Sequence, residues 1–233
     1  MIDWDSVDTV LLDMDGTLLD LHFDNHFWTL ALPAAYGRER GLEPEEARRF
    51  VFAEMRRVQG TLHWYCLDYW RDLLGVDLMA VKRECRHKIG YLPGAERFLA
   101  GLRAGGRRAL LVTNAHRDGL ELKRSCVVLD PYLDGLYTSH DFGASKESGA
   151  FWDAFHREEP FDPARTVFLD DSQRVLAAAR HWGLPRVYGI ARPDSRGPRV
   201  QKAAFPLLDR LDAVAPPQPL PITAGGPGIP PGC

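Results

Sequence analysis

Three short apolar runs along the chain predict buried strands. They are Thr9–Leu12, residues 109–112 and Thr166–Leu169, and a weaker run follows at Arg186–Ile190. Each of the first three is almost continuously apolar, whereas a strand with one face in water alternates apolar and polar side chains. The pattern therefore predicts strands of a parallel sheet that is covered on both faces.

Segments with helical periodicity separate the later runs. Residues 93–103, 117–126 and 172–182 each place apolar side chains at helical spacing, as Phe98 and Leu102 do in the first of them. Strands that alternate with helices are typical of an open α/β sheet.

One interval is far longer than a crossover between strands needs, which is about a dozen residues. Residues 21–90 have helix-type periodicity, and we expect them to form a helical insertion in a core made of residues 1–20 and 91–213. One expected helix begins near Pro44 and has this apolar face: Ala47, Phe50, Val51 and Met55. A second, aromatic-rich helix is expected over residues 62–74, with Gly75 ending it.

Composition excludes several classes of protein. The chain has 233 residues, of which 45% are hydrophobic and 26% charged, as in an ordinary soluble globular protein. It has no apolar run of the roughly 18 residues that span a membrane, and its acidic start is no secretory signal. The formal charge of −3 indicates no nucleic-acid partner.

The cysteines and the C-terminal segment complete this picture. The four cysteines form no C-x-x-C pair, so we interpret them as reduced thiols of a cytoplasmic protein, not a disulfide framework or a zinc site. Residues 216–233 contain 7 Pro and 4 Gly. We expect a flexible tail over residues 214–233, because such a composition buries too little apolar surface to fold.

Polar side chains follow the first three apolar runs where each predicted strand ends. Asp13 and Asp15 follow the first, Thr113 and Asn114 end the second, and the pair Asp170-Asp171 follows the third. In open α/β sheets, ligands bind outside the carboxyl ends of the strands. Four carboxylates in one crevice repel one another unless a cation neutralises them, and all-oxygen ligation suits Mg²⁺.

The spacing of Asp13 and Asp15 suits a two-residue catalytic mechanism. Side chains two residues apart leave a strand on the same side, so Asp13 can attack a phosphoryl group while Asp15 handles a proton. Gly16 permits the tight exit of the chain. Thr113 and Asn114 lie where a strand passes into a helix, a position that favours anion binding.

These motifs resemble those of the haloacid dehalogenase-like (HAD) superfamily. Asp13-Met14-Asp15-Gly16-Thr17-Leu18 is similar to its first motif, Leu111-Val112-Thr113-Asn114 to its second, Lys146 to its third and Phe168-Leu169-Asp170-Asp171-Ser172 to its fourth. The resemblance implies a Rossmann-like core with an inserted α-helical cap, bound Mg²⁺ and a phosphoaspartate intermediate.

The resemblance also implies roles for individual residues. Asp13 would be the nucleophile and a metal ligand, and Asp15 the acid/base that gives its backbone carbonyl to the metal. Asp171 would be the direct metal ligand of the fourth motif, with Asp170 beside it or acting through water. The predicted phosphate-binding residues are Thr113, Asn114 and Lys146.

Segments of the cap and core are similar to the bacterial GMP/IMP nucleotidase subgroup of this superfamily. They are residues 7–21, 64–70, 113–116 and 142–147. Many HAD phosphatases have proline after the lysine of the third motif, where this chain has Glu147. The Pro/Gly-rich tail has no counterpart in the family pattern.

Four further side chains are candidate substrate contacts: His22, Asp24, Asn25 and His116. The alternative for each is a polar residue at the start of a helix. The aromatic residues within 62–70 offer rings for purine stacking, although most rings at helical spacing belong to a core.

We therefore expect a cytoplasmic, Mg²⁺-dependent phosphatase of purine nucleoside 5′-monophosphates (GMP/IMP), acting through an aspartyl phosphate. Its expected partner is this small-molecule nucleotide, with no membrane or nucleic acid, and it is expected to be a monomer or small homo-oligomer. The alternatives are a HAD phosphatase for another small phosphoester, such as a sugar phosphate, and a phospho-accepting signalling domain. An inactive scaffold that binds through the Pro-rich tail is a third.

Overall fold

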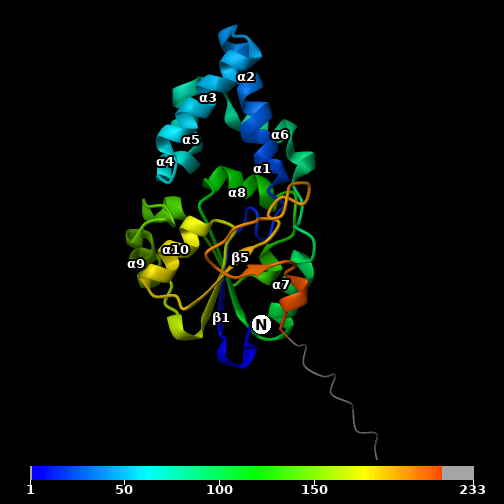
Figure 1. The fold of residues 1–233 in the computed structure, drawn as a ribbon, viewed down its shortest axis with the longest axis vertical. Helices are drawn as coiled ribbons and strands as arrows, with labels where there is room; N and C mark the ends of the chain where they lie inside the picture. Colours follow the sequence, from blue (N-terminus) through cyan, green and yellow to red (C-terminus); the bar gives the residue numbers. More distant parts are fainter. Residues whose placement is uncertain (1, 217–233) are drawn as a thin grey trace, which may run out of the picture.

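The structure is a computed structural model that describes residues 2–216. A sheet flanked by helices forms the lower part of the molecule in Figure 1, and a group of helices stands above it. The predicted flexible tail lies outside the described residues, except for residues 214–216. Of these, Val214 and Ala215 pack against the hydrophobic cluster of the core that includes Phe98 and Leu102.

The sheet has six strands, all parallel, in the order β3-β2-β1-β4-β5-β6. The predicted open parallel sheet is thereby confirmed. The strands are β1 (Thr9–Leu12), β2 (Arg108–Thr113), β3 (Gly135–Thr138), β4 (Thr166–Leu169), β5 (Arg186–Ile190) and β6 (Leu207–Leu208). The sequence pattern did not predict the edge strands β3 and β6, because both are short and only partly buried.

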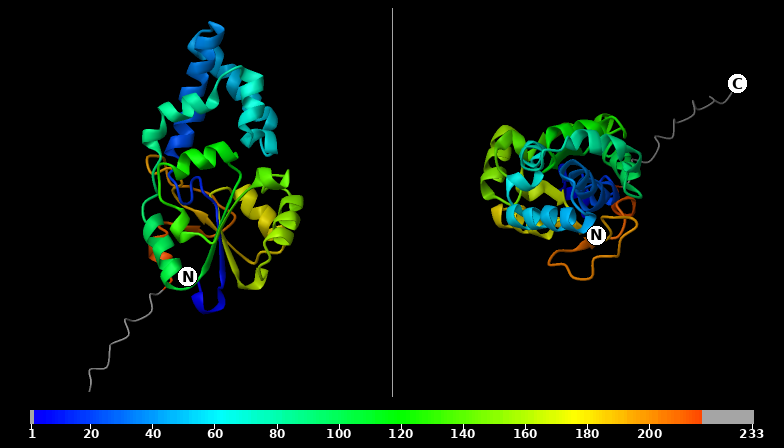
Figure 2. Two further views of the ribbon diagram at one scale, coloured as in Figure 1. Left: turned by 180° about the vertical axis from the view of Figure 1, so that it is seen from behind. Right: turned by 90° about the horizontal axis from the view of Figure 1, so that it is seen from above.

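Helices cover both faces of the sheet, which explains the continuous apolar runs (Figure 2). Along β1, Val10 and Leu12 face one core cluster, which includes the helix α7, whereas Leu11 faces the other, which includes α9 and α10. The core helices are α7 (Ala95–Ala104), α8 (Arg117–Arg124), α9 (Gly149–Glu158) and α10 (Gln173–Trp182). Of these four, α9 was not predicted.

The upper group of helices, here called the cap, has its own hydrophobic core. Its helices are α1 (His22–His26), the π-helical turn η2 (Phe27–Ala31), α2 (Leu32–Arg40), α3 (Pro44–Val58), α4 (Leu62–Tyr65), α5 (Leu67–Leu74) and α6 (Leu78–Glu84). Phe27, Val51 and Trp70 are among its fully buried residues. The predicted helical insertion is therefore present.

Two expectations about the cap were wrong in detail. Residues 62–74 do not form one helix, because the chain is extended at Cys66 (φ −81°, ψ 108°) between α4 and α5. This break allows the indole nitrogen of Trp70 to donate to the carbonyl of Trp64 at 3.0 Å. Phe50 is 39% exposed and stacks on Tyr36 instead of entering the cap core.

Candidate active site

The polar ends of β1, β2 and β4 meet beneath the cap, as the parallel order predicts. A cavity of about 370 Å³ lies there, with the sheet as its floor and the cap as its roof. The floor contributes Asp13, Asp15, Thr113 and Asp171, among others. Its volume is in the range of small-molecule sites.

Lys146 is the buried cation at the centre of the floor and is only 1% exposed. Its ammonium donates to Asp13 Oδ1 at 2.5 Å, to Asp170 Oδ2 at 2.8 Å and to the carbonyl of Val112 at 2.8 Å. Burial opposes the charge, but the two carboxylates outweigh it and raise the pKa of Lys146. The three acceptors use all three N–H donors, so Lys146 holds the two aspartates in place before any phosphate arrives.

The carboxylates of Asp13, Asp170 and Asp171 converge, with one oxygen of each within 4.8 Å of the others. Burial raises the pKa of Asp171 well above its ordinary value, and the nearby charges of Asp170 and Asp13 raise it further. Burial raises the pKa of Asp13 to about 7 against the attraction of Lys146. Within residues 2–216, Asp171 has no ion-pair partner, so it is the carboxylate that most needs a cation. This all-oxygen set fits Mg²⁺.

Gly16 makes room for that cluster. Its φ of +79° lies in the left-handed region, and a Cβ built there would lie 2.6 Å from Asp171 Oδ2. Only glycine therefore allows the loop after β1 to pass so close to the carboxylate.

Asp15 is paired with a cation that the sequence analysis missed. The ammonium of Lys123, on α8, donates to Asp15 Oδ1 at 2.6 Å and to Asp24 Oδ2, in the cap, at 2.7 Å. Lys82, on α6, lies 3.4 Å from the other oxygen of Asp24. Carboxylates and ammonium groups thus alternate from the acid/base candidate into the cap.

The pKa of Asp15 is raised to about 7, chiefly by burial and then by the charge of Asp24, against the attraction of Lys123. A value near neutrality suits a group that must both donate and accept a proton. The pKa of Asp24 moves the other way, since Lys123 and Lys82 outweigh its burial. Asp24 therefore stays ionised and holds Lys123 and Lys82 in ion pairs, and it does not take part in the proton transfer.

Thr113 and Asn114 lie at the end of β2, as predicted. The hydroxyl oxygen of Thr113 accepts the N–H of Ala115 at 3.0 Å, which leaves its proton for an anion. The amide of Asn114 accepts the N–H of Lys146 at 2.9 Å and donates to Glu147 at 3.0 Å. The side chain of Asn114 thus positions the lysine loop in this structure, and its phosphate contact remains a prediction.

Glu147, which departs from the family pattern, joins the core to the cap. Its second carboxylate oxygen accepts the hydroxyl of Tyr65, at the end of α4, at 2.7 Å. The loop that carries Lys146 is therefore tied to a residue that also lines the roof of the cavity.

Three of the four candidate substrate contacts line the cavity, and one does not. Asp24, Asn25 and His116 line the cavity, whereas His22 is absent from its lining. The ring of His22 lies 3.8 Å from the carboxylate of Asp194 instead. Asn25 also donates to Asp194, at 2.8 Å.

Three aromatic side chains of the cap line the roof: Trp28, Trp64 and Tyr65. Trp70, from the same aromatic-rich stretch, is buried in the cap core. The aromatic stretch thus provides rings that line the cavity and a ring that packs in the cap core, the two alternatives that the sequence left open.

Sequence reasoning missed Lys123 and Lys82, and it noted Glu147 without foreseeing its contacts. The signal for Lys123 was its place on the buried face of a helix, at i+3 from Leu120, where an uncompensated ammonium would be costly. No local signal identifies its partners, because they are 99 and 108 residues away in the chain.

A parallel α/β sheet with aspartates at the ends of β1 and β4, a buried lysine between them and a helical cap above defines a capped hydrolase of the HAD type. Residues 7–183 match the haloacid dehalogenase-like hydrolase family, and the chain belongs to that family.

Two curated relatives extend the likeness over both cap and core. GMP/IMP nucleotidase YrfG of Escherichia coli (strain K12) is 41% identical over 208 residues, which cover 89% of this chain and 94% of that protein. The protein of the same name from Shigella flexneri matches to the same extent.

Solved structures share the fold. A HAD phosphatase from Thermococcus onnurineus superposes with a TM-score of 0.72 at 24% identity, over 88% of this chain and 94% of that one. A putative β-phosphoglucomutase from Thermotoga maritima gives a TM-score of 0.60 at 16% identity, over 89% and 96%.

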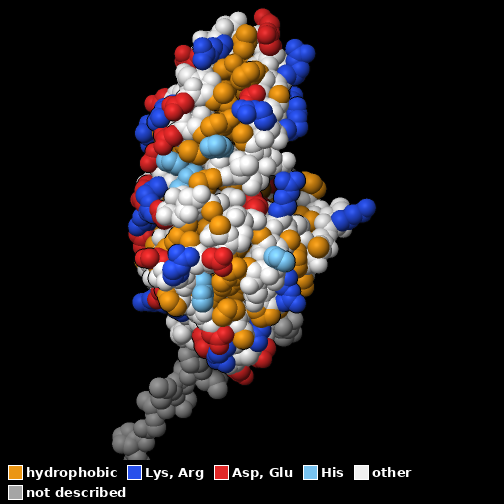
Figure 3. Space-filling model, turned by 90° about the vertical axis from the view of Figure 1, so that its left-hand side faces the viewer, with side chains coloured by type: hydrophobic (Ala, Val, Ile, Leu, Met, Phe, Trp, Pro, Cys, Tyr) orange, Lys and Arg blue, Asp and Glu red, His pale blue; other side chains and the backbone are white. Residues whose placement is uncertain are grey.

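Among the described residues, no helix is both long and apolar enough to cross a membrane. On the face drawn in Figure 3, basic and acidic side chains are interspersed. Histidine side chains appear there at the level where the cap meets the core.

Proposed function

We propose that this enzyme is a Mg²⁺-dependent phosphatase that hydrolyses purine nucleoside 5′-monophosphates, GMP and IMP, through an aspartyl phosphate on Asp13. The observation that carries the proposal is one cavity with a cluster of aspartates on its floor and aromatic rings on its roof. The floor suits a phosphate and a metal ion, and the rings suit a flat base. The similarity to GMP/IMP nucleotidases, which includes the cap, supports this choice of substrate.

In the first step, a carboxylate oxygen of Asp13 attacks phosphorus. The bond between phosphorus and the ribose 5′ oxygen breaks, and Asp15 gives its proton to that oxygen. Asp15 is suited to this because burial keeps part of it protonated near pH 7. Lys146, which already holds Asp13, and the free hydroxyl proton of Thr113 stabilise charge on the phosphoryl oxygens.

In the second step, water replaces the aspartyl oxygen. Asp15, now ionised, takes a proton from the water as its oxygen attacks phosphorus. The bond between phosphorus and Asp13 breaks, which releases inorganic phosphate and restores both carboxyl groups. Lys123 stabilises the ionised form of Asp15 between the two steps.

Asp13, Asp171 and the backbone carbonyl of Asp15 would hold Mg²⁺, with Asp170 beside them. When bound, the ion supplies positive charge that keeps these carboxylates ionised and offsets charge on the phosphoryl group. The crowding of the three side-chain carboxylates, described above, is what the ion would relieve.

The test is phosphate release from GMP, IMP, AMP, a pyrimidine monophosphate and a sugar phosphate, each with Mg²⁺ and with EDTA. We expect preference for GMP and IMP, and loss of activity with EDTA. Equal or greater activity on the sugar phosphate would retain the chemistry but refute the nucleotidase assignment.

The nucleophile has its own test with a matched control. Asp13→Asn is expected to lose activity by more than about 1,000-fold, whereas the same change at the exposed Asp72 of α5 leaves it unchanged. Full Mg²⁺-dependent turnover by Asp13→Asn would refute the mechanism. A wild-type phosphoenzyme that persisted for minutes would favour the signalling alternative.

A further inference from the structure

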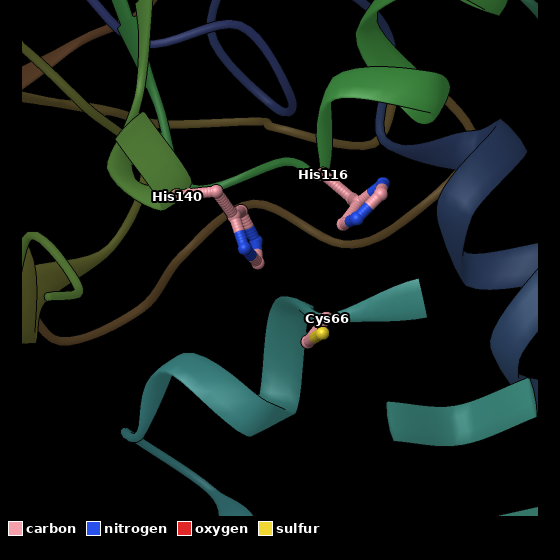
Figure 4. A group of neighbouring side chains, drawn as sticks. All are labelled: Cys66, His116 and His140. Atoms are coloured by element: carbon pink, nitrogen blue, oxygen red, sulfur yellow. The ribbon is translucent and has the colours of Figure 1, made fainter. Parts of the chain in front are cut away.

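Three potential metal ligands meet where the cap touches the core, outside the aspartate cluster. Figure 4 shows Cys66, His116 and His140 pointing toward one another from three segments of the chain. One ligating atom of each lies within 4.8 Å of the others. Cys66 belongs to the cap, at the break between α4 and α5, and the two histidines belong to the core.

Each side chain has a fixed place. The sulfur of Cys66 accepts the N–H of Tyr69 at 3.5 Å and caps α5. His116 caps α8 by accepting the N–H of Asp118 at 3.3 Å. His140 lies in η5 (Ser139–Phe142), with its ring centroid 5.0 Å from that of His116. Cys66 and His116 are therefore fixed at the starts of two helices, and His140 lies within a third element.

His140 contains the feature that points to a ligand. Its Nε2 is shielded from solvent and has no partner at hydrogen-bonding distance and angle among the described residues, although the carbonyls of Tyr65 and Asn114 lie near the ring. A buried polar atom without a partner is costly, and a bound cation would satisfy it. Burial, and then the neighbouring His116, lower the pKa of His140, although the carbonyls of Tyr65 and Asn114 and the charge of Asp141 act the other way.

We propose that Cys66, His116 and His140 bind a zinc-class transition-metal ion that holds the cap against the core and slows turnover. One sulfur and two imidazole nitrogens select such an ion over Mg²⁺, which prefers oxygen. Ligand atoms around tetrahedral zinc lie roughly 3.3–3.7 Å apart, so a separation within 4.8 Å requires each group to move by at most about 1 Å.

The surroundings can complete the coordination. Asp68 Oδ2 lies 3.5 Å from Nε2 of His116, which leaves the fourth position to this carboxylate or to water. Nδ1 of His116, which accepts the N–H of Asp118 in this structure, must carry the ring proton when Nε2 binds a metal, and the carboxylate of Asp118 at 3.9 Å can then accept that proton. On binding, the thiol of Cys66 loses its proton to solvent, and the ion gives up a water for each protein ligand.

The consequence for turnover follows from the position of the site. The cavity lies between cap and core, so substrate enters and product leaves when the two separate. Separation takes Cys66 away from both histidines, and a bound ion therefore favours the closed form. His116 also lines the cavity, next to the end of β2, so the effect reaches the phosphate site directly.

Binding is tested with Co²⁺, without reference to activity. Co²⁺ added to the Mg²⁺-free chain is expected to produce a thiolate-to-cobalt charge-transfer band in the wild type. The exposed Cys126 is the matched control, so Cys126→Ser keeps the band and Cys66→Ser loses it. His140→Gln, which leaves every thiol in place, weakens Co²⁺ binding by about 100-fold. No band in the wild type, or an undiminished band in Cys66→Ser, would overturn the proposal.

The effect on the cap is tested by inhibition at saturating Mg²⁺. Zn²⁺ is expected to slow phosphate release by the wild type and by Cys126→Ser, whereas Cys66→Ser needs about 100-fold more Zn²⁺. Equal inhibition of all three would place Zn²⁺ in the aspartate cluster and refute the cap-closing role. If no phosphoester is hydrolysed, the proposed function fails, while the Co²⁺ titration still decides the metal site. Should Cys66→Ser not fold, His140→Gln serves in both experiments.

Discussion

Lys123 joins the acid/base candidate to the cap, and its removal is the most informative perturbation. It is only 2% exposed and makes ion pairs with Asp15 and Asp24. Lys123→Met preserves the length of the side chain but leaves two buried carboxylates with less positive charge. Breaking a buried ion pair costs about 3–5 kcal/mol. Asp24 keeps Lys82, whereas no other cation among residues 2–216 pairs with Asp15.

The loss of stability is expected to grow with pH. In the wild type, the folded-state pKa of Asp15 is about 7, above its ordinary value. The contribution of Asp15 to the free energy of unfolding therefore falls as pH rises towards 7 and stays constant above it. Without Lys123 that pKa is higher still, and the decline continues past pH 7 by up to about 1.4 kcal/mol per unit. We expect a loss of about 3 kcal/mol at pH 8 and a clearly smaller one at pH 6.

Urea unfolding at both pH values measures this difference. Lys202→Met makes the same change at an exposed position and is expected to leave the unfolding free energy unchanged. The double variant Lys123→Met/Asp15→Asn removes the carboxylate that is left without a cation, and it should recover part of the loss. An equal loss at pH 6 and pH 8 would refute the idea that Lys123 stabilises the ionised form of Asp15.

Further predictions concern the catalytic loop, its proton and the link to the cap. Gly16→Ala is expected to push Asp171 aside and to lose Mg²⁺-dependent activity by more than about 100-fold, measured as phosphate release. The value of kcat/KM should fall as pH rises above about 7, because Asp15 must be protonated to donate; a pH profile measures this. Tyr65→Phe removes a hydrogen bond between cap and core, and we expect it to lower the unfolding free energy by about 1 kcal/mol in urea titrations.

Controls separate these effects from general damage. Gly41→Ala has similar backbone strain (φ +63°) with no atom within 4 Å of the new Cβ, so it should lose stability but keep activity. Tyr69→Phe loses only an exposed contact with Arg57. Activity in Gly16→Ala equal to that of Gly41→Ala, or an alkaline limb that does not move to higher pH in Lys123→Met, would contradict the roles given to these residues.

The central strands and the acidic floor of the site were predictable because both depend on local pattern. A strand buried on both faces must be apolar throughout, and parallel order brings the carboxyl ends of β1, β2 and β4 to one edge. Asp13, Asp15, Thr113 and Asp171 could therefore be placed together before any contact was known. The edge strands β3 and β6 were missed because partial burial demands no such pattern.

The roof of the cavity and the links to it were decided by tertiary structure alone. Whether Trp64 lines the cavity while Trp70 fills the cap core depends on the break at Cys66, which the helical spacing of the segment conceals. The partners of Lys123 lie on the loop after β1 and on the first helix of the cap, so no nearby residue reveals them.

The sequence by itself thus determined the sheet, the helical insertion and the chemistry at the strand ends, since burial and chain direction constrain each residue locally. The position of the cap on the core decided the remaining contacts. It determined which carboxylate Lys123 stabilises, and it placed Glu147 against Tyr65 and Cys66 against His116 and His140. Most of these contacts join the core to the cap, which have separate hydrophobic clusters. Their pairing depends on the fit of two surfaces, which the periodicity of neither segment encodes.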